Sequence, residues 1–389
     1  MKFLKEDGDT FAITVCKKND CTGCAACIDI CPKKAIKIVD SLTAYNAVID
    51  NQACIKCGAC HKVCQNNDSV EAVYPILWKQ GWALDIDVRN RSSSGGVAQA
   101  LELAFVKSNG VVCSCLFENG KFIFTFAKSE DDVKKFTGSK YVKSSPEGVY
   151  KKIKAFLQGG QKVLFVGLPC QVAAVKKYVG SKNANNLYTV DLICHGTPSP
   201  QILENFLRQY DIDINTLADI QFRENNKFQL KENMKHIGIK GVLDKYSMAF
   251  LNSICYTENC YNCKYAKIER VSDITLGDSW GSELESNEQA KGVSLILSQS
   301  SKGSELLNKA NLELVDVDLN NAVAHNHQLQ YPSVMPNKRT KFFTDIKNGK
   351  KFNTVVRKCY PKQSMKQFVK SILIRTKIYG GGRVKQDME

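Results

Sequence analysis

Hydrophobic and polar positions recur with clear periods in the middle of the chain. In residues 111–127, VVCSCLFENGKFIFTFA, apolar side chains alternate with others on both sides of Asn119-Gly120, a pattern that predicts a β-hairpin. Just before it, residues 97–107 have the spacing of a helix with one apolar face. The middle of the chain therefore mixes helices and strands.

The stretch after the hairpin predicts a strand at 162–166, a helix at 171–178 and a second strand at 187–193. In such a β-α-β unit the two strands are parallel neighbours, so their carboxyl ends meet at one edge of the sheet. Cys170 lies in the tight turn after the first strand, and Cys194 directly follows the second. Open α/β sheets bind ligands at this edge, so both cysteines are candidate site residues.

Residues 364–379, SMKQFVKSILIRTKIY, also have a helical period. One face of this predicted helix is apolar, lysines lie beside or opposite it, and the glycines at 380–382 would end it. The apolar stripe consists of Met365, Phe368, Val369, Ile372 and Leu373. A stripe of this kind packs on the protein body or, on a basic helix, lies on an anionic membrane.

Composition and length point to a globular protein with several cores. The chain has 389 residues, enough for two or three domains, and its hydrophobic fraction of 43% is ordinary. No apolar run approaches the roughly eighteen residues that a membrane span needs. The charged start MKFLKEDGDTF lacks the core of a signal peptide, so we expect a cytoplasmic location.

The net charge of +15 is concentrated near the C-terminus. Residues 1–75 hold nine lysines and nine acidic residues, whereas residues 338–389 hold fifteen Lys or Arg and three acidic residues, a net +12. A basic tail on a nearly neutral body argues against a nucleic-acid groove. The same charge favours peripheral contact of the tail with an anionic membrane.

Seventeen cysteines are many for a reducing compartment, where they act as ligands or catalytic thiols more often than as disulfides. Residues 21–32, CTGCAACIDICP, and 54–64, CIKCGACHKVC, both fit C-x-x-C-x-x-C-x-x-x-C, the bacterial ferredoxin spacing. The fourth cysteine of each run normally reaches the other cluster. The runs predict two 4Fe–4S clusters, one held by Cys21, Cys24, Cys27 and Cys64 and the other by Cys54, Cys57, Cys60 and Cys31.

Two details qualify this interpretation. Pro32 follows the first run as the pattern expects, but Gln65 stands where a second proline is usual. Zinc also uses C-x-x-C pairs, although two complete four-cysteine runs in tandem disfavour it.

Four further cysteines predict a third site. Cys260-Tyr-Asn-Cys263 is a C-x-x-C pair that can join Cys170 and Cys194, which gives four thiolates from three loops for a third 4Fe–4S cluster. Zinc remains an alternative, as does a catalytic Cys170 with His195 as its base. Cys255 could replace one member of the pair.

Two stretches with glycine and serine could hold an anionic cofactor. Residues 91–96, RSSSGG, precede the helix at 97–107 and would expose backbone N–H groups, although a plain serine N-cap gives the same pattern. Residues 136–142, FTGSKYV, contain a Gly-Ser-Lys turn that can hold a phosphate or a flavin carbonyl, although a lysine in a turn is usually solvated.

Six motifs occur together in one order and resemble a known family. They are SSGG (93–96), GSKYV (138–142), GLPCQ (167–171), DLICHG (191–196), C-x-x-C (260–263) and DITLGDSWG (273–281). The set resembles the beta subunits of coenzyme F-420-dependent hydrogenases and formate dehydrogenases, from about Ile86 to Phe343, with a dicluster ferredoxin in front. The resemblance implies an α/β core that binds FAD, with a 4Fe–4S cluster close to the flavin.

The resemblance also implies roles for single residues. The cluster ligands would be Cys170, Cys194, Cys260 and Cys263, and the flavin-site candidates are Ser94, Gly95, Gly96, Gly138, Ser139, Lys140 and Tyr141. Asp278 lies in a matching motif, but its role cannot be derived from it. Catalytic residues stay unassigned, and the motifs leave open whether this chain uses coenzyme F-420.

The expected architecture is α+β followed by α/β. Residues 1–75 would form a dicluster ferredoxin domain, and residues 76–160 and 161–345 the N-terminal and C-terminal domains of a beta-subunit-type flavin-binding core. Residues 346–389 would form a basic amphipathic tail.

The expected function is that of an iron–sulfur flavoprotein oxidoreductase. Electrons from a redox partner protein or a reduced cofactor would pass through the clusters to FAD and on to a small organic substrate that the sequence does not identify. The resemblance links many bacterial relatives to extracellular polysaccharide synthesis. The alternative is an electron-transfer subunit that serves a separate catalytic protein.

Overall fold

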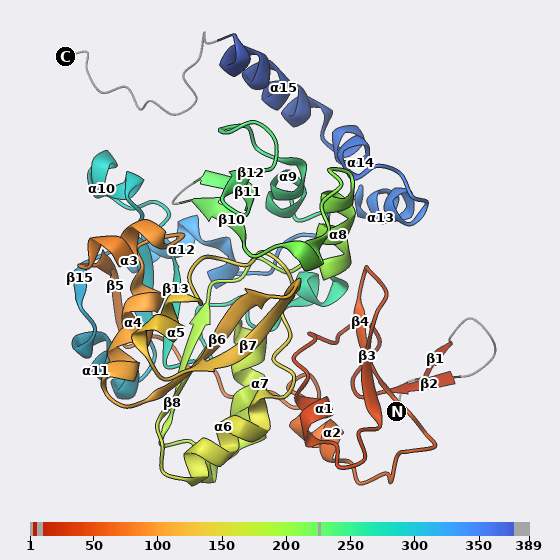
Figure 1. The fold of residues 1–389 in the computed structure, drawn as a ribbon. Coiled ribbons are helices and arrows are strands. Elements are labelled where there is room, and N and C mark those ends of the chain that lie inside the picture. The colour runs from red at the N-terminus through yellow and green to blue at the C-terminus, as the bar shows by residue number, and fades with distance from the viewer. Residues whose placement is uncertain (1–2, 6–10, 225–226, 377–389) are drawn as a thin grey trace.

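The computed structural model describes the chain apart from residues 1–2, 6–10, 225–226 and 377–389 (Figure 1). Its largest feature is an eight-stranded mixed sheet. The strands are β5 (Leu77–Ala83), β6 (Val111–Glu118), β7 (Lys121–Ala127), β8 (Val163–Gly167), β9 (Leu187–Leu192), β13 (Ile274–Asp278), β14 (Ser294–Ser298) and β15 (Leu312–Val315).

Four parallel strands form the centre of this sheet. The order is β15-β5-β14-β13-β9-β8-β6-β7, in which β13, β9, β8 and β6 run parallel and the outer strands pair antiparallel. The carboxyl ends of β8, β9 and β13 therefore share one edge. An α/β core is confirmed.

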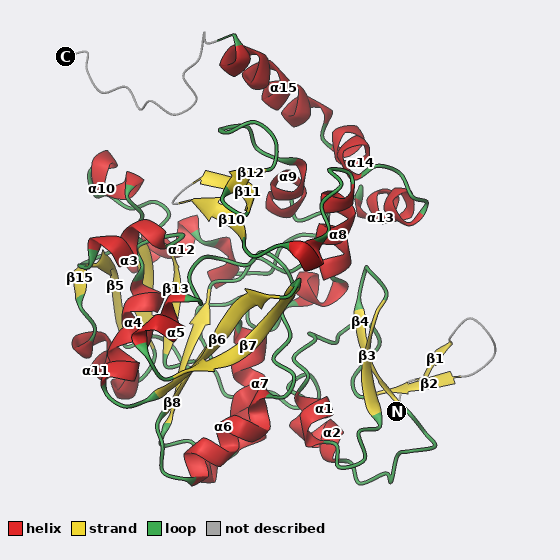
Figure 2. Ribbon diagram, viewed as in Figure 1, coloured by secondary structure: helices red, strands yellow, loops and turns green. Residues whose placement is uncertain are grey.

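Helices cover both faces of the sheet (Figure 2). On one face, Val97, Leu101 and Phe105 lie one turn apart on α4 and pack on strand residues such as Val112 and Leu164. Helices α5 and α11 lie on the same face, and α6 and α7 pack on the other. The helices around the sheet are α3 (Ile86–Arg91), α4 (Val97–Lys107), α5 (Glu130–Lys134), α6 (Val149–Gln158), α7 (Pro169–Val179), α10 (Ser286–Ala290), α11 (Ser301–Lys309) and α12 (Leu319–His325).

The sequence predictions for this region are confirmed with one shift. The hairpin turns at Asn119-Gly120, both with positive φ, and β8 and β9 are parallel neighbours. The helix predicted at 171–178 begins earlier, because Pro169 occupies its first turn and the Gln171 side chain accepts a hydrogen bond from the Leu168 N–H at 2.9 Å. Cys170 thus lies in the first turn of α7.

A smaller antiparallel sheet forms near the N-terminus, in the order β1-β2-β4-β3, together with two short helices. The elements are β1 (Phe3–Lys5), β2 (Phe11–Thr14), α1 (Ala26–Ile30), β3 (Ile36–Asp40), β4 (Tyr45–Ile49) and α2 (Ala59–Val63). The Asp29 carboxylate of α1 accepts hydrogen bonds from the N–H groups of Gly148 and Tyr150 at the start of α6. This contact fixes the N-terminal unit to the core.

A third layer lies beyond the carboxyl edge of the large sheet (Figure 1). A three-stranded sheet and four helices share a core there that includes Phe206, Phe222, Tyr246, Phe342 and Phe352. The elements are α8 (Pro200–Arg208), β10 (Ile220–Glu224), β11 (Lys227–Glu232), β12 (Lys235–His236), α9 (Lys245–Leu251), α13 (Arg339–Lys347) and α14 (Phe352–Cys359).

The last described helix, α15 (Pro361–Arg375), lies at the periphery (Figure 1). Its polar side chains face the body: Gln363 bonds to Asn252, and Gln367 accepts from the Leu243 N–H. The apolar stripe faces outward, so packing through this stripe is wrong as a prediction. The glycines at 380–382, the predicted end of the helix, lie outside the described residues.

Two further observations concern the whole chain. Segments 76–160 and 161–345 both contribute strands to one sheet, and β5 of the first segment lies between β15 and β14 of the second. Within the part of the chain that the structure describes, no helix is long and apolar enough to cross a membrane.

Candidate functional site

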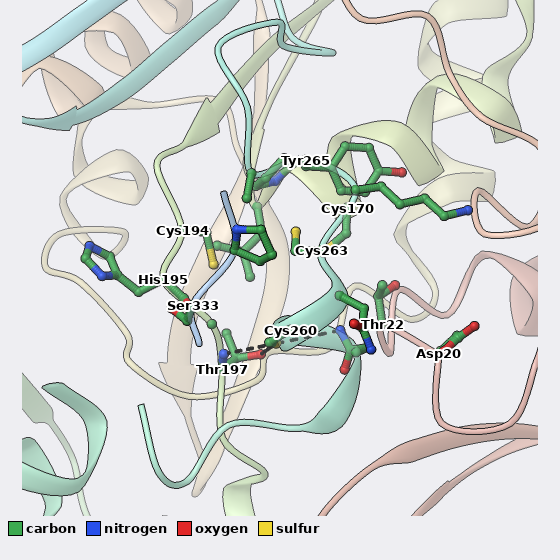
Figure 3. Close-up of a pocket in the computed structure, with 18 of the residues that line it drawn as sticks. Asp20, Thr22, Cys170, Cys194, His195, Thr197, Cys260, Cys263, Tyr265 and Ser333 are labelled. Atoms are coloured by element: carbon green, nitrogen blue, oxygen red, sulfur yellow. Dashed lines mark hydrogen bonds between the residues drawn. The ribbon is translucent and has the colours of Figure 1, made fainter. Parts of the chain in front are cut away.

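A cavity of about 300 Å³ lies beyond the carboxyl ends of β8 and β9. The four thiols predicted for a third cluster all line it, from the first turn of α7, the loop after β9, and the short 3-10 helix η3 (Glu258–Asn262) with the residue that follows it (Figure 3). They are Cys170, Cys194, Cys260 and Cys263. Cys255 instead packs among aromatic side chains of the third layer.

Hydrogen-bond donors surround the sulfur atoms of this cavity. The Cys260 Sγ accepts from the Thr197 N–H at 3.4 Å and from the Asn259 amide at 3.6 Å. Backbone N–H groups near Gly196 and Tyr265 serve Cys194 and Cys263 in the same way. A neutral thiol is a weak acceptor, so these donors suit sulfur atoms that carry negative charge, as ligands of iron do.

As free thiols these cysteines would be poor nucleophiles. Burial raises the pKa of Cys170 well above its usual value and that of Cys194 to about 12. His195 does not serve as a base for Cys170, because its Nδ1 contacts the Gln328 amide at 2.7 Å and its ring is turned away from the cysteines (Figure 3). Burial, together with the neighbouring His327, lowers the pKa of His195 to about 4.

The thiols line the cavity rather than meet at one point. Among the described residues, no group of three or more His, Cys, Asp or Glu side chains is arranged to hold a single metal ion. A 4Fe–4S cluster is bound through irons at separate corners, which spaces its ligands around a larger volume.

A second, narrower cavity lies inside the N-terminal unit. The predicted set Cys21, Cys24, Cys27 and Cys64 lines it, and so does a fifth thiol, Cys16. All five side chains are buried. We refer to the four predicted ligands as the inner set.

The other predicted set lies closer to solvent. Cys31, Cys54 and Cys60 are half-buried and interact with one another, whereas Cys57 is exposed. Backbone N–H groups donate to Cys31 and Cys54 at 3.3 Å each. We refer to Cys54, Cys57, Cys60 and Cys31 as the outer set.

The three thiol groups lie next to one another in a fixed order. Cys60 of the outer set is close enough to Cys27 of the inner set to affect its pKa, and Cys24 affects the pKa of Cys170 in the same way. Thr22 and Asn66 line both cavities. The order from the exposed Cys57 to the sheet edge is outer set, inner set and third site.

Gln65 and Lys143 occupy the wall between the two cavities. The Gln65 amide donates to Thr22 at 3.1 Å and its carbonyl oxygen accepts from the Tyr265 hydroxyl, which gives a structural reason for the missing second proline. The buried Lys143 ammonium donates to the Thr22 carbonyl at 3.1 Å and lies over the Tyr45 ring. This positive charge favours the thiolate form of thiols in both groups and opposes the effect of burial on their pKa.

The flavin-site candidates come together at the same edge of the sheet. The Ser139 N–H donates to Ser93 Oγ at 2.9 Å, which joins the stretches 91–96 and 136–142. The Gly95 N–H donates to Ser294 at 3.0 Å, and Ser294 pairs with Asp278 in the sheet. A plain serine N-cap is wrong as a prediction, because the cap of α4 is Gly96 with φ +81°.

Asp278 is bound by Arg223, a residue that the sequence analysis did not single out. The Arg223 guanidinium bonds to both Asp278 oxygens, at 2.6 and 3.0 Å, and donates to the Tyr141 hydroxyl at 3.4 Å. Together with the contacts above, these bonds connect the candidates in a ring. Ser94-Gly95 is linked to Asp278 through Ser294, Asp278 is linked to Tyr141 through Arg223, and Tyr141 is two residues from Ser139, which bonds to Ser93. The ring lies beside His195, whose pKa both charged groups influence.

Lys140 is placed differently from the expectation of a solvated turn lysine. Its ammonium donates to the carbonyls of Phe136 and Thr137 at 2.6 and 3.1 Å. Burial lowers its pKa, while burial of nearby Glu102 raises the pKa of that carboxyl to about 7. Gly138, with φ +85°, has open space where a side chain would project.

Sequence comparisons with known proteins agree with the motifs. Residues 160–318 match a family model that describes the C terminus of the coenzyme F420 hydrogenase/dehydrogenase beta subunit. The chain is 23% identical to the F subunit of the F(420)H(2) dehydrogenase of Methanosarcina mazei over 282 residues, which cover 67% of this chain and 78% of that protein. A chain of the F420-reducing NiFe hydrogenase complex from Methanosarcina barkeri aligns with 67% of this chain and 91% of its own length, at 18% identity and a TM-score of 0.48.

Proposed function

The chain belongs to the coenzyme F420 hydrogenase/dehydrogenase beta-subunit family, and on that premise we propose that it is an iron–sulfur flavoprotein oxidoreductase. The named Methanosarcina mazei relative is part of a dehydrogenase, which supports an oxidoreductase role. The observation that carries the proposal is the order of the three thiol groups, from the exposed Cys57 to the sheet edge beside Asp278.

In this proposal each thiol group holds one 4Fe–4S cluster, and the N-terminal unit is a dicluster ferredoxin domain. When bound, the clusters would supply one-electron transfer and FAD would convert single electrons into a two-electron reduction of an organic substrate. The protein holds the thiols in sequence, donates N–H groups to their sulfur atoms and places the Lys143 cation between two of them. The inner set is buried, which excludes water from the middle of the series.

The proposed FAD site is the ring around Asp278. Its open glycine at 138 and the stretch 93–96 at the start of α4 fit an anionic cofactor at the carboxyl edge of the sheet. The Arg223–Asp278 pair gives this edge a fixed polar group, and Trp280 lies 5.7 Å from the guanidinium. These contacts support FAD and leave the use of coenzyme F-420 open.

The flavin proposal is tested by FAD release on anaerobic denaturation. Ser93→Ala removes the hydroxyl that joins the two stretches and should lower the FAD content per chain. Ser108→Ala is the matched control, because this exposed serine lies at the other end of the same helix. Equal FAD content in both variants would mean that residues 91–96 and 136–142 form ordinary turns that do not bind FAD.

A second candidate function is that of an electron-transfer subunit, which the name of the Methanosarcina mazei relative favours. The two functions differ in where the substrate is reduced. Purified chain that reduces a small organic acceptor by itself supports the enzyme. Chain that loads clusters and takes up electrons but turns over only with a second protein supports the electron-transfer role. The role in polysaccharide synthesis stays a proposal that a substrate screen would test.

We further propose that α15 contacts an anionic membrane surface from the cytoplasmic side. Four side chains of its apolar stripe are exposed, Met365 by 62%, Phe368 by 59%, Val369 by 47% and Ile372 by 44%. Lys362, Lys366, Lys370 and Arg375 lie on the same helix, and each basic residue near an anionic surface contributes about 1 kcal/mol. The polar contacts of Gln363 and Gln367 leave the stripe free to face a bilayer.

Vesicle sedimentation tests this contact. Full-length protein should bind anionic vesicles, bind less as salt rises, and ignore neutral vesicles. Phe368→Ser with Ile372→Ser should abolish binding, whereas Val334→Ser with Met335→Ser removes exposed apolar side chains elsewhere and should not. If the wild type ignores anionic vesicles at low salt, the membrane contact is wrong.

A further inference from the structure

The inner cavity contains one thiol more than a 4Fe–4S cluster needs. Four cysteines account for the predicted ligands, yet Cys16 lines the same cavity and is buried with them. Cys16 follows β2 by two residues and belongs to neither four-cysteine run. Its position therefore needs an explanation beyond the ferredoxin spacing.

The Cys16 side chain lies between two of the predicted ligands. Its thiol hydrogen-bonds with the sulfur atoms of Cys21 and Cys64. All three side chains line the same narrow cavity. A thiol that contacts the sulfur of a ligand lies beside the iron that this ligand would hold.

The backbone around Cys16 is held in place. Thr14 Oγ1 donates to the Cys16 carbonyl at 2.7 Å, and the Val15 N–H donates to the Ala47 carbonyl at 2.9 Å. The Asn66 amide donates to the Asp20 carbonyl at 2.5 Å and reaches Cys16 Sγ at 3.8 Å. This amide ties the segment after Cys64 to the segment of Cys16, so the two thiols stay neighbours.

Cys64 differs from the other three ligands of the inner set. Cys21, Cys24 and Cys27 come from the first run, whereas Cys64 comes from the second run, at the end of α2. Loss of this single distant ligand would leave three thiols from one run and one iron without a protein ligand. Cys16 is the neighbouring thiol that can replace it.

We propose that Cys16 is a spare ligand of the inner cluster that takes the place of Cys64 when the bond from that residue to iron is lost. The proposal rests on the cluster sites of the proposed function. In the exchange the iron–sulfur bond to Cys64 breaks and one to Cys16 forms. The proton that leaves the Cys16 thiol is taken up by the Cys64 thiolate, so no oxidant or reductant is needed.

Anaerobic iron and sulfide analysis of four proteins tests the exchange. Wild type and Cys64→Ser should both retain about twelve irons per chain, whereas Cys16→Ser with Cys64→Ser should fall to about eight. The Cys27 thiol lies on the side of Cys60, where Cys16 does not reach. The iron content of Cys27→Ser should therefore fall to about eight per chain although Cys16 is present. A Cys64→Ser variant that loses iron as fully as the double variant overturns the proposal.

A measurement without ligand substitutions covers the case in which those variants misfold. On exposure to dilute oxygen, Cys16→Ala should lose the inner cluster at least twice as fast as wild type. Cys359→Ala removes a buried thiol in the third layer and should behave as wild type. Equal rates in the two variants overturn the spare-ligand proposal, whereas a wild type without iron would contradict the proposed function itself.

Discussion

The two four-cysteine runs have the same spacing and nearly the same backbone, yet they lie in different surroundings. Gly23 and Lys56 occupy equivalent places and both have positive φ, +74° and +55°. Ala25 and Gly58, the residues before α1 and α2, are also equivalent, with φ of +60° and +72°. Spacing thus determines the local backbone of both runs, whichever residue type occupies the left-handed positions.

Burial distinguishes the two runs. The inner set is fully buried beside α6 and α7, whereas the outer set is half-buried and Cys57 is exposed. The difference comes from docking: Asp29 caps α6, and the Tyr150 hydroxyl donates to the Cys24 carbonyl at 2.6 Å. The comparison shows that one motif can occur in two settings, near solvent in the outer set and buried against the core in the inner set.

Removal of the outer set should give the largest effect on the rate of electron transfer. In Cys54→Ser with Cys57→Ser, flavin reduction by a reduced ferredoxin should slow by about 100-fold, equivalent to about 2.7 kcal/mol in activation free energy. The reason is that the outer set contains Cys57, the exposed cysteine of the three groups. Stopped-flow absorbance of the flavin measures the rate, with dithionite as a small reductant that bypasses this set. Wild-type rates with ferredoxin would show that electrons enter elsewhere.

Alanine substitutions of one glycine in each run test the comparison through the stability of the protein. A methyl group at Gly23 would lie 2.8 Å from Tyr45 Cδ2, so Gly23→Ala combines a left-handed backbone with overpacking and should cost about 2–4 kcal/mol. Gly58→Ala has a similar φ but no atom within 4 Å, and should cost about 1–2 kcal/mol. Melting followed by circular dichroism at one scan rate compares them. Equal melting temperatures would mean that the backbone at Gly23 accommodates a methyl group as easily as the backbone at Gly58.

The charge beside the inner set should have a smaller effect, visible in reduction potentials. Lys143→Met removes a buried cation near Cys21 and Cys170 and should lower the potentials of the clusters there by about 60 mV, equivalent to about 1.4 kcal/mol. Lys264→Met is the control, since this lysine lines the same cavity but is exposed to screening water. Equal shifts in an EPR-monitored titration would contradict a special role for burial of Lys143.

Much of the site follows from short-range pattern. The spacing of the cysteine runs, the hairpin at Asn119-Gly120 and the β-α-β unit around Cys170 depend on neighbouring residues and on the handedness of such units. Each of these elements is present in the structure. The gathering of Cys170, Cys194, Cys260 and Cys263 at one cavity also agrees with the sequence, because strand order and motif order together restrict where the loops can meet.

The residues that were missed act through long-range contacts. Arg223 reaches Asp278 from a strand of the third layer, and Gln65 reaches Tyr265 across 200 residues. No periodicity connects such positions. Cys16 did carry a signal, since it stands five residues before the first run, but its separation from the motif concealed it. The helical pattern of α15 left two orientations of its apolar stripe open, because such a pattern does not state which face meets the body.

The most direct measurement of the central claim is iron and acid-labile sulfide in protein purified without oxygen. Three thiol groups that each hold a 4Fe–4S cluster predict about twelve irons per chain, matched by sulfide and with little zinc. Cys170→Ser with Cys194→Ser should lower the count to about eight and leave the inner and outer sets loaded. A wild type with about eight irons, or a double variant with unchanged iron, would contradict the third cluster and with it the continuous path to the sheet edge.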